Sequence, residues 1–136
     1  MHKQFAPRFI FSVILIIALG SCAVQADNLL VNGDFSAQNN GFTSDYSYVP
    51  SGQSTTAGTH GIRTISTDFN AGYTSFTDHT SGSGYMMLLD GAASPSSIGW
   101  AETVAVRTNK TYYFSAWLAS SDPTSPATVR VFVNGN

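Results

Sequence analysis

The sequence predicts an all-β fold, and three observations support that expectation. Residues 98–106 and 128–133 alternate apolar and polar side chains with the period of a strand. Residues 111–121 hold four aromatic side chains, with apolar groups on both alternating faces, which favours a central strand covered on both sides. No helical periodicity follows residue 26, and the spacing of the turn-rich stretches suits a β-sandwich or jelly roll.

Residues 1–26 have the parts of a secretory signal: the basic Lys3 and Arg8, an apolar run, and small residues before Asp27. The apolar run, residues 9–19, is shorter than the roughly 20 residues that a membrane-spanning helix needs. We therefore expect export to the extracellular space and a single β-sandwich domain over residues 27–136.

Two processing patterns overlap at the end of this leader. Residues 24–26, Val-Gln-Ala, suit an ordinary signal peptidase, whereas residues 19–22, Leu-Gly-Ser-Cys, resemble a bacterial lipobox with Cys22 as the lipidated residue. Lipidation would anchor the protein at the membrane of the cell envelope, but it would leave only a short tether before the domain, so the sequence favours soluble release. Because Cys22 is the only cysteine, no disulfide can form within the mature chain.

Composition narrows the classes of partner. Hydrophobic residues make up 43% of the chain and charged residues only 10%. Beyond residue 26, four basic residues stand against eight acidic ones, a net charge of −4, which disfavours nucleic acid as a partner.

Further strands are expected at residues 42–49, 61–66 and 85–89, and residues 28–35 should form a short apolar strand that runs into a turn at Asn32-Gly33-Asp34. In the strand at 42–49 the aromatic residues Phe42, Tyr46 and Tyr48 should share one face, either as core or as a platform for stacking sugars. A tight turn at residues 108–110 should make residues 98–106 and 111–121 antiparallel neighbours. Of the two long loops, residues 50–59 and 67–84, the second carries aromatic side chains that should fold over the core as a lid, and such loops are often functional. Residues 128–133 run into Asn134-Gly135, a hairpin signal without a partner strand, so we expect the domain to lack its last strands and its edge to self-associate.

Four segments together resemble the galactose-binding-like jelly rolls, which include bacterial xylan- and glucan-binding modules and secreted single-domain proteins with a PEP-CTERM sorting tail. These segments are NLLVNGDFS from residue 28, GFTSDYSYV from residue 41, DHTSGSGYMMLLDG from residue 78, and WAETVAVRTNKTYYFSAW from residue 100. The resemblance implies an eight-stranded jelly roll that binds glycans without catalysis, often with a structural Ca²⁺. Ser36 stands where many relatives carry a glutamate, which leaves Asp34 as the candidate metal ligand, short of the six or more oxygens that Ca²⁺ takes.

Catalytic constellations find little support. Asp78 and His79 are adjacent, so on a strand their side chains would point to opposite faces rather than build a Ser-His-Asp triad; a structural role before Tyr85 is expected instead. His60 and His79 alone make a poor zinc site. Glu102 is the only glutamate and has no evident carboxylate partner for glycoside hydrolysis. The sequence therefore does not predict an enzyme.

The sequence suits a binding module better, because it offers aromatic rings on which sugars stack their CH faces and polar side chains to which sugar hydroxyls bond. The alternative for each ring is burial in the core, as also expected for Trp117. The sequence thus predicts a non-catalytic, secreted carbohydrate-binding or extracellular-matrix module that binds polysaccharide, or else a structural, adhesive surface protein without a specific sugar ligand. The predicted ligand contacts are Tyr46, Tyr48, Arg63, Tyr73, Asp78, Trp100 and Glu102.

Overall fold

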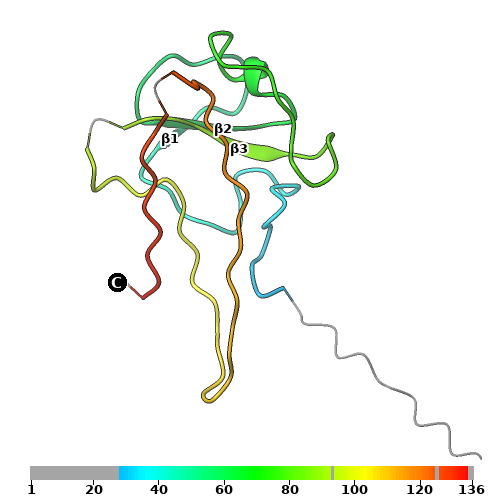
Figure 1. Ribbon diagram of the computed structural model, residues 1–136, viewed down its shortest axis with the longest axis vertical. Coiled ribbons are helices and arrows are strands. Elements are labelled where there is room, and N and C mark those ends of the chain that lie inside the picture. The colour runs from blue at the N-terminus through cyan, green and yellow to red at the C-terminus, as the bar shows by residue number, and fades with distance from the viewer. Residues whose placement is uncertain (1–27, 93, 125, 135–136) are drawn as a thin grey trace, which may run out of the picture.

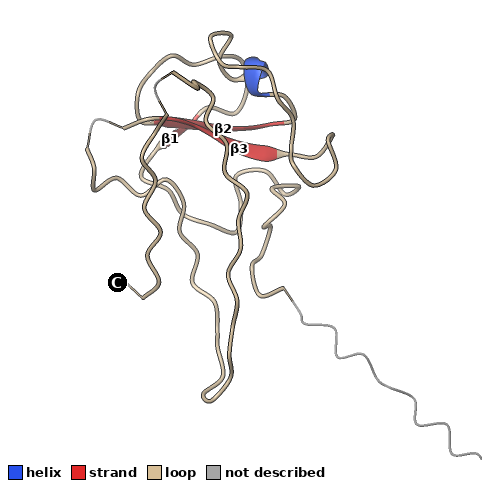
Figure 2. Cartoon of the chain, viewed as in Figure 1, coloured by secondary structure: helices blue, strands red, loops and turns tan. Residues whose placement is uncertain are grey.

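A small mixed sheet runs through the globular upper part of the computed structural model, which describes residues 28–92, 94–124 and 126–134 (Figures 1 and 2). Its strands are β1 (Ser47–Tyr48), β2 (Thr59–Arg63) and β3 (Met86–Asp90), in the order β1-β2-β3. β1 runs parallel to β2, and β2 runs antiparallel to β3. The described residues contain no α-helix, so the all-β class is confirmed, but they form no second sheet packed face to face on this one.

β2 is the buried strand, and its glycine explains how the core closes. Gly61 has no side chain, and a Cβ placed there would lie 2.6 Å from the ring of Phe69. Phe69 follows a 3-10 turn, η1 (Ser66–Asp68), and is 0% exposed. The predicted lid is therefore confirmed, because the loop after β2 folds back and seats an aromatic ring on that strand.

Two predicted strands are confirmed with small shifts. The strand expected at residues 85–89 is β3, one residue later, and the strand expected at 61–66 is β2, which begins and ends earlier. In residues 42–48 the side chains alternate between half-buried and exposed, as predicted, although only the last two residues form β1. The start of this stretch pairs with a different segment, since the Thr43 and Ala101 backbones form two hydrogen bonds with each other, at 2.8 and 2.9 Å.

The turn predicted at Asn32 is confirmed, but the short strand predicted just before it is wrong, since residues 28–31 form no strand. Asn32 adopts a positive φ of 66°, which asparagine tolerates better than most residues. Its side-chain amide donates to the carbonyls of Gln38 and Asn40 and accepts from the Ala37 amide. These three bonds hold the turn and the polar loop after it in a compact form.

Residues 98–121 form a long hairpin that projects from the sheet, and we call this hairpin the arm (Figure 1). Its turn falls at the predicted place, with Asn109 at a positive φ of 59°. The central strand predicted at residues 111–121 is nevertheless wrong, since Tyr113 is 95% exposed and Trp117 is 73% exposed. A strand with two apolar faces needs a layer on each side, and the described residues supply none there.

The predicted leader, residues 1–26, lies outside the described residues. Within the part of the chain that is described, no helix has the length and hydrophobicity needed to cross a membrane.

Candidate functional site

An open groove of about 430 Å³ lies where the start of the domain meets the base of the arm. Among the ligand contacts predicted from the sequence, Glu102 is the one that lines it. The lining residues are Val31, Gly41, Phe42, Thr43, Ala101, Glu102 and Thr103.

The groove is held together by contacts between distant segments. The paired backbones of Thr43 and Ala101 join its two sides, and the Thr43 hydroxyl also donates to the Ala101 carbonyl at 3.3 Å. Gly41 allows a third segment to approach, because its φ is +83° and a Cβ there would lie 2.8 Å from the Val31 carbonyl oxygen. The groove is therefore shaped largely by backbone.

Glu102 provides the carboxylate of the groove. Oε1 accepts a hydrogen bond from the Val31 amide at 2.7 Å. Oε2 is buried and has no hydrogen-bond partner among the described residues. An unsatisfied carboxylate oxygen is costly in a protein interior, so this atom favours any donor that enters beside it.

Phe42 provides the aromatic ring of the groove. Its centroid lies 5.8 Å from that of Phe35, edge to face, and 6.2 Å from that of His60. His60 is buried on β2, the middle strand of the sheet: Nδ1 donates to the Tyr46 carbonyl at 3.0 Å, and Nε2 lies 2.8 Å from Oδ1 of Asn39. Burial lowers the pKa of His60, and the hydrogen bond to the Tyr46 carbonyl opposes this shift.

The two predicted tyrosines of the aromatic face make internal contacts. The Tyr46 hydroxyl accepts from the Ala92 amide at 3.1 Å. The Tyr48 ring lies 5.2 Å from His60, and both tyrosines are half-buried. Their role as ligand contacts stays a prediction, and the structure does not bring them into the groove.

Arg63 and Tyr73 tie loops to the sheet. The Arg63 guanidinium donates to the carbonyls of Ile62, Val49 and Gly52. The Tyr73 hydroxyl donates to the Leu89 carbonyl at 3.0 Å, and burial, with the Asp90 charge as a smaller cause, raises its pKa. Both side chains lie away from the groove.

Asp78 organises its own turn. Its carboxylate accepts from the backbone amides of Thr80, Ser81 and Gly84, and the Ser81 amide is the main cause of its lowered pKa. This confirms the structural role expected for Asp78 just before Tyr85. His79 is engaged separately, its ring stacked on that of Trp117 with centroids 3.5 Å apart and planes 13° apart.

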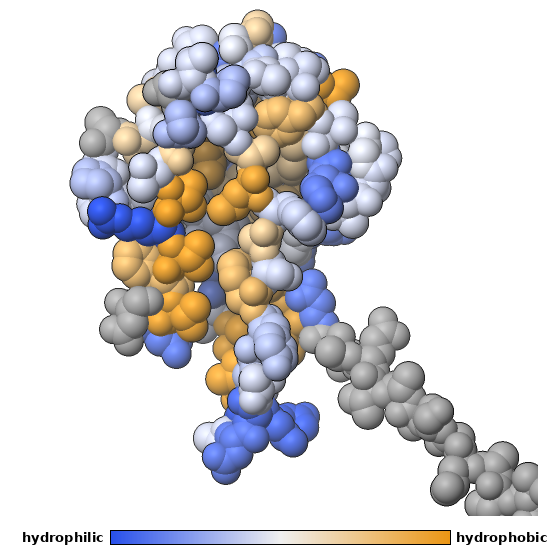
Figure 3. Space-filling view, in the orientation of Figure 1, coloured by the Kyte–Doolittle hydropathy of each residue, from blue (hydrophilic) through white to orange (hydrophobic). Residues whose placement is uncertain are grey.

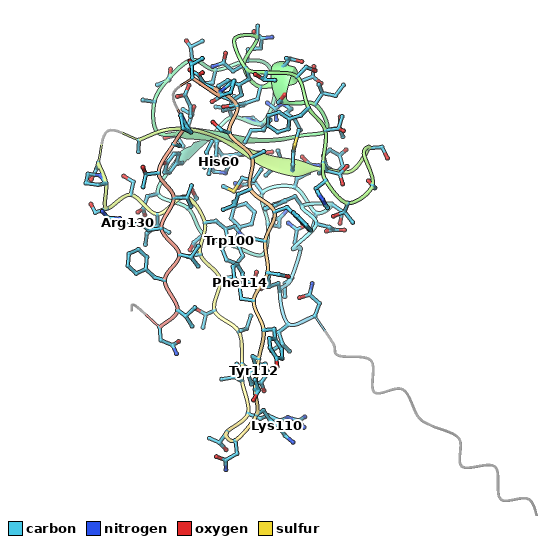
Figure 4. The ribbon with its side chains drawn as sticks, in the orientation of Figure 1. His60, Trp100, Lys110, Tyr112, Phe114 and Arg130 are labelled. Carbon is cyan, nitrogen blue, oxygen red and sulfur yellow. The ribbon has the colours of Figure 1, made fainter. Side chains whose placement is uncertain are left out.

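Trp100 and Asp34 complete the predicted set. Trp100 is half-buried at the base of the arm (Figure 4), next to groove residues in sequence but not part of the lining. Asp34 is exposed and accepts from the amide and hydroxyl of Ser36, the amide being the main cause of its lowered pKa. The described residues contain no group of three or more histidine, cysteine or acidic side chains placed to hold a metal ion, so a calcium ligand at Asp34 stays a prediction.

The sequence did not single out Phe42 or Thr103 as site residues. For Phe42 a signal existed, since it belongs to the aromatic face of residues 42–49 that was considered as a sugar platform. Thr103 had no such signal in the sequence, because its place in the groove depends on the pairing of Thr43 with Ala101.

No family model matches the chain, and neither the curated proteins nor the solved structures compared with it include a match.

Proposed function

We propose that this protein is a non-catalytic carbohydrate-binding module, exported from the cell, and that the groove at Glu102 binds part of a neutral glycan. The single observation that carries the proposal is that Glu102, whose Oε2 has no hydrogen-bond partner among the described residues, lines the same groove as the aromatic Phe42. A sugar hydroxyl would donate to this oxygen while a CH face packs against Phe42. The hydroxyls of Thr43 and Thr103 add polar groups that fix orientation.

A galactose-binding-like jelly roll is the architecture we propose for the whole domain. The antiparallel pairing of residues 43–45 with residues 98–101 supports it, because it joins an early segment of the domain to the base of the arm. In this architecture residues 98–106 and 128–133 would be further strands. Their alternating sequences suit that role.

The non-catalytic assignment is supported by how the one adjacent acid and imidazole are used. Asp78 bonds within its turn, while His79 stacks on Trp117. Both side chains are thus engaged in separate structural contacts, with no geometry that would pass a proton between them.

Isothermal titration calorimetry against a panel of neutral xylo- and gluco-oligosaccharides tests the proposal. Thr103→Val removes a groove hydroxyl at nearly constant shape, and we expect it to weaken binding several-fold. Thr108→Val at the arm tip makes the same change outside the groove and should leave affinity unchanged. Heat without saturation for every sugar, or equal affinity in the two variants, would overturn the proposal.

A structural or adhesive role is the second candidate, favoured by the exposed aromatic and aliphatic side chains of the arm. A module of this kind would bind surfaces or neighbours without a saturable sugar signal. The same titrations separate the two roles.

A further inference from the structure

Residues 128–134, which we call the terminal segment, run extended along the molecule with their apolar side chains in solvent (Figures 1 and 3). Val131 is 60% exposed and Phe132 is 64% exposed. Within the described residues, no backbone group of this segment takes part in a hydrogen bond. An extended apolar segment with free N–H and C=O groups is a template for a further strand.

We propose that the terminal segment pairs with the same segment of a second copy, antiparallel, about a twofold axis at Val131. We propose a second copy as the partner because the segment is complementary to itself in this arrangement. In this register Val129 lies opposite Val133 of the partner subunit, and Arg130 lies opposite the partner subunit's Phe132. All seven residues from 128 to 134 then have a partner. The valines of one copy lie opposite valines of the other, and the residues of the other face likewise lie opposite one another.

Arg130 selects among the registers. In the part of the chain that is described, it has no ion pair, and the segment carries no other charge. A parallel in-register pair, or an antiparallel pair centred on residue 130, would place two arginines directly opposite each other, which is destabilising. Centring on Val131 instead sets each guanidinium across from an aromatic ring, where a cation–π contact is favourable.

Other registers lose either the arginine–aromatic pair or the matching faces. A centre at residue 132 sets Arg130 opposite Asn134 and so gives it no aromatic partner. A centre between residues 130 and 131 sets Arg130 opposite Val131 and Val129 opposite Phe132, which mixes the valine face with the other face. The register at Val131 keeps the valines of both chains on one face, so one covering layer could bury them together.

Cysteine cross-linking in the full-length chain carrying Cys22→Ser tests the register. Directly opposite residues have Cβ atoms roughly 4.5–5.5 Å apart, within reach of a short bismaleimide. Val131→Cys should cross-link to itself. Val129→Cys and Val133→Cys should each cross-link poorly alone but efficiently when the two variants are mixed. Val106→Cys, at a 61% exposed valine of the arm, is the control for random collision.

We expect a several-fold larger dimer fraction for Val131→Cys than for Val106→Cys, and a concentration-dependent dimer in sedimentation velocity. Val131→Lys should abolish the dimer without changing the circular dichroism spectrum, since the side chain lies in solvent. Equal cross-linking at positions 131 and 106, or a monomer at all concentrations, would overturn the proposal. So would a dimer that persists in Val131→Lys, because the interface would then lie elsewhere, for example along the arm.

Discussion

The Glu102 carboxylate accepts a hydrogen bond from the main-chain amide of Val31 at 2.7 Å, across 71 positions of sequence. This bond fastens the first loop of the domain to the base of the arm. The same carboxylate lines the groove, where its second oxygen has no partner among the described residues. Glu102 thus serves both the packing of the domain and the proposed site.

Glu102→Ala should lower the free energy of unfolding by about 1–2 kcal/mol, because the Val31 amide loses a charged acceptor. Urea denaturation followed by circular dichroism measures the change. Glu102→Gln is the matched control: it keeps an oxygen for the amide and removes the charge, so it should cost less. Equal losses in the two variants would show that the charge, rather than the bond to Val31, stabilises this junction.

Gly61→Ala should destabilise the protein by about 1–3 kcal/mol, the usual cost of overpacking a core. The new methyl would lie 2.6 Å from the buried Phe69 ring, which leaves no space for it without a shift. Gly91→Ala, just beyond β3, is the control, since a Cβ there meets no atom within 4 Å. Thermal unfolding of both variants checks the prediction, and similar melting temperatures would mean that the Phe69 ring is not seated on β2 as described.

Local sequence signals predicted the centre of the fold well. The strand at β3 and the structural role of Asp78 before it could both be predicted from the sequence, because strand propensity and turn chemistry depend on residues that are close in sequence. The aromatic lid was also predicted, and Phe69 proved to be its anchor. These features depend on contacts within one or two loops.

The candidate site and the arm were harder to predict, for physical reasons. The groove exists only because Thr43 pairs with Ala101, a contact that no local pattern encodes. The composition around Trp117 favours a covered strand, but coverage depends on which other segments pack there, and the described residues leave that ring mostly exposed.

His60 should make stability depend on pH. Burial lowers its folded pKa below the ordinary value of 6.5, so the unfolded chain binds a proton more readily. Stability is therefore fully present above pH 6.5, falls as the pH drops from there to the folded pKa, and levels off below it. Urea titrations between pH 7.5 and about pH 5 should show this decline, and His60→Gln should reduce it. His79→Gln is the control that should retain it, and an unchanged decline in His60→Gln would contradict the assignment.

Trp117→Ala should leave the protein folded, because the side chain is 73% exposed and its aromatic contact within the described residues is the stack on His79. This replaces the expectation of a core tryptophan, whose removal would cost roughly 3–5 kcal/mol.

A double-mutant cycle of Trp117→Ala with His79→Ala should give a coupling free energy of about 0.5–1.5 kcal/mol, the usual contribution of a pair of aromatic rings. Chemical denaturation of the four proteins measures it, and Tyr113→Ala, which removes an almost fully exposed ring from the same stretch of the arm, is the control. Unfolding of Trp117→Ala in the absence of denaturant would mean that the arm is packed into a core, and a coupling near zero would mean that the two rings do not hold the arm to the loop.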